Sequence, residues 1–251
     1  MIDMKYQLFT YDDAGAQRGG LTAGGLWFDL AKLAALAGKG SLPATELNAL
    51  LPVWQEAAKA LDALVAQVAA GPGRFQDAQL DANRLTLLPP VTRPGAIFAA
   101  GANYRDHVEA MGRALNQKVV LDPKKEGIAP WHFLKSGPAT LSGHKGEVHV
   151  PPATQRLDWE AELAVVIGRR AQRVSVDSAL DHVAGYMCAN DLSARDHLLR
   201  AKVDVSSPFR FDWIGHKSFN GSCPLGPVFT PARFVESPEN LDIKLWLNGE
   251  L

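Results

Sequence analysis

Cysteine is scarce in this sequence of 251 residues, which contains only Cys188 and Cys223. Neither belongs to a CxxC pair or to a cluster with histidine, which argues against a disulfide framework and a structural zinc site. Net charge is also small, at −1, so the composition does not point to nucleic acid or a membrane surface as partner. No apolar run approaches the roughly 20 residues of a membrane span, and we see no secretory signal. A cytoplasmic location is therefore the expectation.

The composition is that of a globular protein, with 47% hydrophobic and 21% charged residues. Residues 1–90 are expected to form a small α+β N-terminal domain that ends in a linker. Its predicted elements are a strand at Lys5–Tyr11, a hairpin-like region at Leu21–Leu30 around Gly24-Gly25, and helices at Leu30–Ala37 and Pro52–Ala70. Gly19 and Gly20 are expected to interrupt the first strands. The linker, at residues 71–94, is rich in proline and glycine and contains a short strand at Leu85–Leu88.

Residues 91–251 have a different texture, in which short apolar runs are separated by glycine and proline. The predicted strands are Ala96–Ala100, His132–Leu134, Leu163–Ile167, Val183–Met187, Leu225–Phe229 and Leu241–Leu247. This pattern predicts an α+β, β-rich chain with a closed or folded-over sheet. Asn248-Gly249 is a strong signal for a two-residue hairpin turn, yet no returning strand follows it. We therefore expect that a natural C-terminal segment is absent from this sequence.

The segment from Asp158 to Gly168, DWEAELAVVIG, carries clustered carboxylates ahead of an apolar run. If it forms a strand, Asp158, Glu160 and Glu162 share one face, because side chains alternate. Clustered carboxylates repel one another, and a bound cation would relieve the repulsion. Oxygen ligands without histidine or cysteine favour Mg²⁺, Mn²⁺ or Ca²⁺ over zinc. A solvated strand face at a sheet edge explains the same pattern equally well.

Three other short segments carry chemically useful side chains beside predicted strands. Asp191 follows a strand within ANDLSARD, where Arg195 and Asp196 can equally form a salt bridge or cap a helix. His107, within GANYRDH, can act as a general base, although a single histidine is more often structural. Lys217, within HKSFNGSCPLGP, can hold a substrate anion, although a surface lysine is the ordinary explanation. None of these segments decides the function alone.

One known family has all of these segments in this order. The chain resembles the fumarylacetoacetate hydrolase family in GANYRDH, FLKSGPATLSG, DWEAELAVVIG, CANDLSARD and HKSFNGSCPLGP. Residues 1–90 resemble the small, variable N-terminal domain that many members carry. The resemblance implies a mixed β-roll or β-sandwich catalytic domain over residues 91–251, a homodimer, and a Mg²⁺ or Mn²⁺ ion. It also implies roles by position: Glu160, Glu162 and Asp191 as metal ligands, His107 and Lys217 as catalytic residues, and Tyr104, Lys135, Ser136 and Arg195 as substrate-binding residues.

The resemblance further implies a reaction on a 1,3-dicarbonyl or β-keto acid that chelates the metal. The metal would stabilise the enolate left when a C–C bond breaks, while His107 activates water and Lys217 supports the oxyanion. The chain departs from the family at Ala110, where members often have a glutamate that pairs with the histidine. The nearest acid is Glu109, which a helix would turn by about 100° from that position.

We therefore expect a hydrolase of acylpyruvate or fumarylpyruvate type, in aromatic or oxo-acid catabolism, with a small oxo-acid as substrate and Glu109 as a candidate catalytic residue. The departure at Ala110 favours reactions that need no attacking water over hydrolysis. A decarboxylase, isomerase or hydratase on the same metal site is thus the first alternative. A non-enzymatic, β-rich protein that holds a structural ion is the second.

Overall fold

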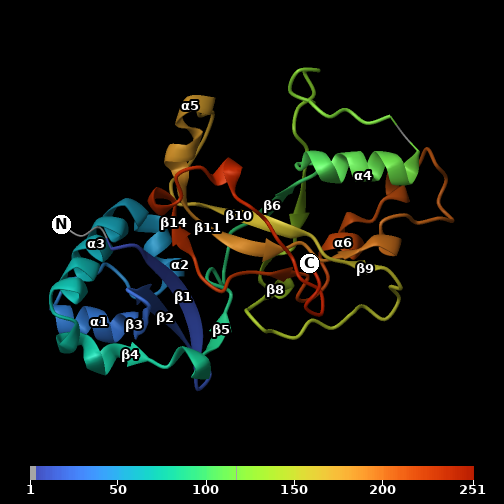
Figure 1. Ribbon diagram of the computed structural model, residues 1–251. Helices are drawn as coiled ribbons and strands as arrows, with labels where there is room; N and C mark the ends of the chain where they lie inside the picture. Colours follow the sequence, from blue (N-terminus) through green and yellow to red (C-terminus); the bar gives the residue numbers. More distant parts are fainter. Residues whose placement is uncertain (1–3, 117) are drawn as a thin grey trace.

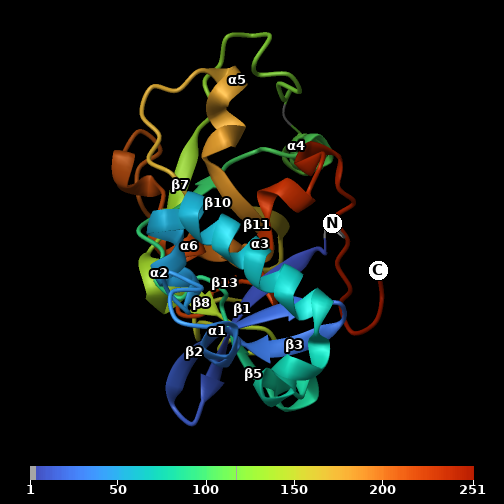
Figure 2. The same ribbon diagram turned by 90° about the vertical axis from the view of Figure 1, so that its left-hand side faces the viewer.

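The N-terminal part of the chain forms an antiparallel sheet covered by helices in the computed structural model, which describes residues 4–116 and 118–251 (Figure 1). Residues 1–3 of the predicted N-terminal domain lie outside this range. The sheet has the order β4-β3-β2-β1-β5. Its strands are β1 (Tyr6–Asp13), β2 (Ala16–Ala23), β3 (Leu26–Asp29), β4 (Gln79–Leu80) and β5 (Thr86–Leu88). The helices are α1 (Leu30–Ala37), α2 (Leu47–Leu50) and α3 (Trp54–Ala70). Figures 1 and 2 show α1 and α3 on the outer side of this sheet.

Helix α3 confirms the predicted long helix, although it begins at Trp54 after a 3-10 turn rather than at Pro52. It buries the apolar stripe that its sequence spacing predicts, and this stripe consists of Ala57, Leu61, Leu64, Val65 and Val68. Residues at this spacing share one helix face, so burying them packs the whole helix against the sheet. Helix α1 starts where expected because Asp29 caps it, accepting a hydrogen bond of 2.7 Å from the backbone nitrogen of Lys32.

Gly19 and Gly20 lie inside β2, so the prediction that they interrupt the first strands is wrong. A Cβ atom at Gly19 would lie 2.0 Å from the backbone oxygen of Thr45, and one at Gly20 would lie 2.0 Å from Cζ of Phe9. Glycine within a strand often marks such a close approach. The predicted turn at Gly24-Gly25 is confirmed, because both residues have positive φ and connect β2 to β3.

The Gly19→Ala variant is expected to lower the free energy of unfolding by about 1–3 kcal/mol, the usual cost of forcing volume into a packed site. The obstructing atom is a backbone oxygen, which cannot swing aside as a side chain can. Urea unfolding followed by circular dichroism measures the loss. Gly95→Ala is the matched control, because a Cβ atom there would meet no atom within 4 Å. Equal stabilities of the two variants would contradict the prediction.

The rest of the chain forms several small sheets and short helices. Strands β10 (Ala161–Ile167), β11 (Val183–Asn190) and β14 (Thr230–Pro231) make a three-stranded sheet. The two-stranded pairs are β6 (Ile97–Ala100) with β7 (His132–Lys135), β9 (Leu157–Asp158) with β12 (Ser193–Ala194), and β8 (Leu141–Ser142) with β13 (Cys223–Pro224). The helices are α4 (Arg105–Leu115), α5 (Val176–Ala179) and α6 (Trp213–Lys217). Short 3-10 helices lie at Leu51–Val53, Pro72–Ala78, Ala82–Arg84, Gly137–Thr140, Leu180–His182, Arg195–His197, Pro208–Arg210, Ala232–Phe234 and Pro238–Asn240.

A continuous apolar core joins the N-terminal sheet to the remainder of the chain. The backbones of Leu8 and Phe229 exchange two hydrogen bonds of 2.9 and 2.7 Å. Phe229 is fully buried and meets the ring of Trp54 edge-on, with centroids 5.2 Å apart. Burial of these rings excludes water from the junction and so favours a fixed arrangement of the two parts. The domain boundary near residue 90 stays a prediction.

The predicted strand Leu225–Phe229 is wrong in its interior. Gly226 has a φ of 116°, and Pro227 has no N–H group to donate to a neighbouring strand. Only the two ends of the segment make bridges, Leu225 with Ala189 and Phe229 with Leu8. The apolar run is therefore a buried connection between β13 and β14 rather than a strand.

The predicted strand Leu241–Leu247 does not form, although its residues alternate like a strand. In the part of the chain that the structure describes, no strand lies beside it to accept its backbone hydrogen bonds. The predicted hairpin turn at Asn248-Gly249 is confirmed, because Leu247 and Glu250 exchange backbone hydrogen bonds of 2.8 and 3.0 Å. Both turn residues have positive φ, as a two-residue hairpin requires.

Candidate active site

Glu160 and Asp191 lie side by side where β10 begins and β11 ends. These strands are antiparallel, and their register pairs Ala161 with Asn190, so the residues just outside the pair meet. The backbone nitrogen of Asp191 donates to the oxygen of Glu160 at 2.8 Å, and the nitrogen of Glu160 donates to Oδ1 of Asn190 at 3.1 Å. Two acids that are 31 positions apart in sequence are thus fixed at one sheet edge.

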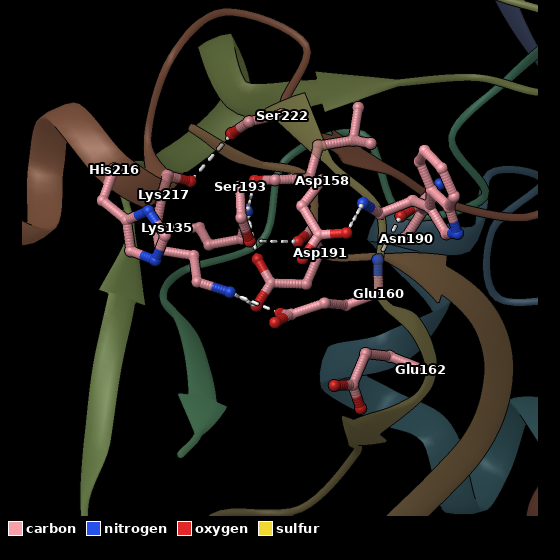
Figure 3. A network of polar contacts seen from close by, with 12 residues as sticks. Lys135, Asp158, Glu160, Glu162, Asn190, Asp191, Ser193, His216, Lys217 and Ser222 are labelled. Atoms are coloured by element: carbon pink, nitrogen blue, oxygen red, sulfur yellow. Dashed lines mark hydrogen bonds and ion pairs between the residues drawn. The ribbon is translucent and has the colours of Figure 1, made fainter. Parts of the chain in front are cut away.

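Two buried lysines neutralise this pair of acids (Figure 3). Lys217 Nζ lies 2.7 Å from Asp191 Oδ2 and also contacts Glu160 Oε2. Lys135 Nζ contacts Asp191 Oδ1 on the other side and lies 3.4 Å from the backbone oxygen of Leu192. Both lysines are 3% exposed. Buried charges of opposite sign must be paired in this way, because each one alone would lose its hydration.

The pKa values of this cluster reflect the competition between burial and charge. Burial by itself would raise the pKa of Asp191, but the ammonium groups of Lys135 and Lys217 outweigh it and hold the pKa below its ordinary value. Burial lowers the pKa of Lys135, and the attraction of Asp191 offsets only part of that effect. Asp191 is therefore held as a carboxylate between two cations.

Arg195 completes the network from the far side of Glu160. Its Nε lies 2.7 Å from Asp158 Oδ2, and its Nη2 contacts Glu160 Oε1. The neighbouring Asp196 turns elsewhere and accepts hydrogen bonds from Thr154 and from the backbone of Gln155. A salt bridge between Arg195 and Asp196 was one reading of the sequence, and the structure instead pairs Arg195 with the two acids of the DWE segment.

Glu162 lies apart from this network, as Figure 3 shows. Asn103 Nδ2 approaches Glu162 Oε2 at 3.5 Å. Burial is the main cause that raises the pKa of Glu162, with the charges of Glu160 and Asp191 adding to it, while Tyr104 and Asn103 oppose the shift. Burial and the nearby Glu162 carboxylate together raise the pKa of Tyr104. Within the described residues no ion pair involves Glu162.

A cavity of about 1230 Å³ opens onto these groups. Its polar lining includes Asn103, Lys135, Glu162 and Asp191. The apolar lining near them includes Met187, Cys223 and Leu225. Lys217 and Glu160 are not among the residues that line the cavity, and Lys217 contacts it only through Asp191. A substrate in this space would therefore meet the polar groups of Asn103, Lys135, Glu162 and Asp191.

The donor chemistry suits a hard divalent cation, although the three predicted ligands are not gathered around one point. Glu160, Glu162 and Asp191 offer only carboxylate oxygens, which Mg²⁺ and Mn²⁺ prefer. Glu162 is a half-buried carboxylate near two other acids, and its donors among the described residues are the neutral side chains of Asn103 and Tyr104. An added cation would therefore offset its burial. No three His, Cys, Asp or Glu side chains converge on a metal position in residues 4–116 and 118–251. The ammonium group of Lys217 lies between Glu160 and Asp191. The assignment of Glu160, Glu162 and Asp191 as metal ligands therefore stays a prediction.

The two candidate catalytic residues on α4, His107 and Glu109, make no hydrogen bond or ion pair with each other among the described residues. Glu109 accepts from Arg105 Nε at 3.3 Å, as an i,i+4 pair on the exposed side of the helix. His107 is half-buried in the first turns of α4, and the described residues place no hydrogen bond on its ring. Ser136 is anchored through its backbone nitrogen, which donates to Oγ of Ser218 at 3.2 Å. The structure thus brings together Lys135, Lys217 and Arg195 with the acids, and leaves His107 and Glu109 unpaired with each other.

Several contributing residues lacked a clear signal in the sequence. Asn103 precedes the motif tyrosine and Asn190 precedes the motif aspartate, so their positions beside motif residues were the only hint. The centroid of the Phe133 ring lies 4.9 Å from Lys217 Nζ, and no local sequence pattern predicts this contact. The prediction that Asp158, Glu160 and Glu162 share one strand face is wrong, because Asp158 ends β9, Glu160 lies between the strands and Glu162 lies in β10. The ion pair of Asp158 with Arg195 becomes visible only in three dimensions.

Comparison with known proteins identifies the family. Residues 96–251 match the family model described as fumarylacetoacetate (FAA) hydrolase C-terminal. The chain belongs to the fumarylacetoacetate hydrolase family. The resemblance inferred from the ordered motifs is thereby confirmed.

Relatives within the fumarylacetoacetate hydrolase family include proteins named oxaloacetate tautomerase. The mitochondrial protein of Homo sapiens is 37% identical over 172 residues, which cover 68% of this chain and 49% of the relative. The Bacillus subtilis protein is 38% identical over 174 residues, covering 67% of this chain and 50% of the relative. The chain spans about half the length of these relatives.

Solved structures of the family share the fold. A fumarylacetoacetate hydrolase from Exiguobacterium antarcticum has a TM-score of 0.54 and 24% identity, with 91% of this chain and 67% of that chain covered. A maleylpyruvate hydrolase from Sphingobium, solved with manganese and pyruvate, has a TM-score of 0.58 and 23% identity, with 92% and 69% covered. The predicted α+β, β-rich fold of fumarylacetoacetate hydrolase type is confirmed.

Other expectations about this family member stay predictions. They are the homodimer, the absence of nucleic-acid and membrane partners, and the cytoplasmic location. Within residues 4–116 and 118–251, no helix combines the length and apolar character needed to cross a membrane.

Proposed function

We propose that this chain carries the active site of a metal-dependent enzyme that interconverts the keto and enol forms of a 2-oxo acid of the oxaloacetate class. The observation that carries the proposal is the buried ammonium group of Lys135, which lines the cavity and is fixed by Asp191. An enolate oxygen formed in this cavity would face a preorganised positive charge with little water to screen it. Relatives named oxaloacetate tautomerases support the same reaction.

Tautomerisation suits the groups that the cavity presents. One proton leaves the carbon beside the carbonyl, and one proton is added to the carbonyl oxygen, so no water molecule has to attack. Lys135 would stabilise the negative charge on that oxygen, and Asn103 and Tyr104 would border the substrate near Glu162. A divalent cation, when bound, would supply Lewis-acid stabilisation of the enolate. Glu160, Glu162 and Asp191 are the residues that would hold it.

Cleavage of a C–C bond by water, as the sequence predicts, is the second candidate. One observation favours it: His107 lies in the first turn of α4, close in sequence to Tyr104, which faces Glu162. A backbone hydrogen bond from Val108 to Tyr104 closes this turn. The first turn of α4 thus follows directly on the residue that faces Glu162, which supports a role for His107 at this site. The pairing of Glu109 with Arg105 counts against it, because a hydrolytic base usually needs a partner that orients its ring.

The test follows two reactions with the same protein. Ketonisation of enol oxaloacetate is recorded by ultraviolet absorbance, and hydrolysis of an acylpyruvate is recorded by pyruvate release, each with Mg²⁺ or Mn²⁺. The blank contains the same metal without protein, because metal ions alone catalyse enolisation. We expect acceleration of ketonisation and no pyruvate release. Pyruvate release without acceleration of ketonisation would replace the proposal with the hydrolase.

A further inference from the structure

Strand β7 sends two side chains toward the charged network. Side chains alternate along a strand, so Phe133 and Lys135 share one face while His132 and Leu134 point the other way and are exposed. Lys135 reaches Asp191, as described above. Phe133 lies beside it and meets the second lysine. One four-residue strand thus supplies one of the two buried ammonium groups and an aromatic contact to the other.

The ring of Phe133 forms one wall of the space around Lys217. Lys217 Nζ lies 4.9 Å from the centroid of this ring, within the range of a cation–π contact. The carboxylates of Glu160 and Asp191 bind the same ammonium group. Because Lys217 is almost completely buried, water competes little with the ring for the charge. Such desolvated contacts lie at the strong end of the cation–π range.

Neighbouring aromatic residues hold this ring in place. Trp213 stacks on Phe133 with centroids 5.4 Å apart and an interplanar angle of 21°. Trp213 precedes Lys217 by four residues on α6, so both side chains project from the same side of the helix toward Phe133. Trp131 packs against Trp213 at 5.3 Å and lies over Gly101, where a Cβ atom would be 2.0 Å from its ring. These contacts restrict the orientation of the Phe133 ring.

We propose that Phe133 is a positioning residue, whose ring face fixes the Lys217 ammonium between Glu160 and Asp191 and thereby keeps these two acids side by side for the reaction. The ring does not need to touch the substrate. Its effect is electrostatic as well as steric, because the face of the ring carries negative charge density. The activity part of the following test rests on the proposed function, and its second part does not.

The first part of the test replaces Phe133 with phenylalanines that carry one, two or three fluorine atoms, introduced at this position alone. Fluorine withdraws electron density from the ring face while the ring keeps its shape. We expect kcat for ketonisation to fall stepwise, by about tenfold at the last member, with little change in KM. A structural role alone would leave kcat level across the series, and a level series would overturn the proposal. The same series at Phe209, which is 72% exposed, is the matched control.

The second part observes Lys217 directly by NMR in protein with isotope-labelled lysine. The ε-methylene signal of Lys217, assigned by its loss in Lys217→Met, is expected to be displaced by the ring current of Phe133. The displacement should persist in Phe133→Tyr and vanish in Phe133→Leu. If the protein does not ketonise oxaloacetate, the proposed function fails and this signal decides the inference alone. A Lys217 signal that is undisplaced, or that is unchanged in Phe133→Leu, would overturn it.

Discussion

The Lys135→Met variant is expected to lose about 100-fold or more in kcat for ketonisation, the usual cost of removing one charge-stabilising donor from an active site. Lys135 is the ammonium group that both lines the cavity and contacts Asp191. Methionine is unbranched and flexible like lysine and only slightly shorter, so it fills most of the same space. The loss therefore reports the charge rather than the volume of the side chain.

The fold should survive this substitution, which makes the activity readout interpretable. Asp191 keeps its 2.7 Å contact with Lys217, so no carboxylate is left buried without a cation. Circular dichroism and the urea midpoint check this point. Lys125→Met is the matched control, because Lys125 is an exposed lysine that pairs with Asp122 at 2.8 Å. A Lys135→Met protein that is folded and fully active would refute the assignment of Lys135.

The pairing of Glu160 with Asp191 shows how much of the site the sequence could predict. Each acid lies within four residues of an apolar run that reads as a strand, and antiparallel pairing of the two strands brings the acids to one edge. The ordered motifs then fixed the family. The three basic residues that surround the acids were also named, although with roles toward a substrate rather than toward the acids.

The parts that could not be predicted depend on distant contacts. Gly19 and Gly20 look like strand breakers, and only the packing of Thr45 and Phe9 shows why a strand needs them. The run Leu225–Phe229 has a strand-like composition, yet the backbone at Gly226 turns it into a connection. The position of Lys217 between two acids depends on β10, β11 and α6 at once, so no local pattern carries it. Local propensity loses to tertiary packing in each case.

The Asp191→Asn variant is expected to lower the free energy of unfolding by about 3–5 kcal/mol, which is typical of breaking a buried ion pair from one side. Asp191 is the acid that both buried lysines share. Without its charge, Lys217 still has Glu160, whereas Lys135 has only the backbone oxygen of Leu192 at 3.4 Å among the described residues. A nearly inaccessible ammonium group would then lack a counter-ion. Urea unfolding measures the loss.

A double variant separates the charge from other effects of the substitution at Asp191. In Asp191→Asn with Lys135→Met, the stranded ammonium group is removed together with its partner, and Lys217 keeps its contact with Glu160. We expect the double variant to be more stable than Asp191→Asn alone, because replacing both members of a buried pair costs less than removing one. Two results would contradict this prediction: Asp191→Asn as stable as the parent, or a double variant less stable than Asp191→Asn. Either would mean that the buried lysines do not need the Asp191 carboxylate as a counter-ion. The acid at the end of β11 would then serve the chemistry alone, and the network around it would not be what holds the two strand ends together.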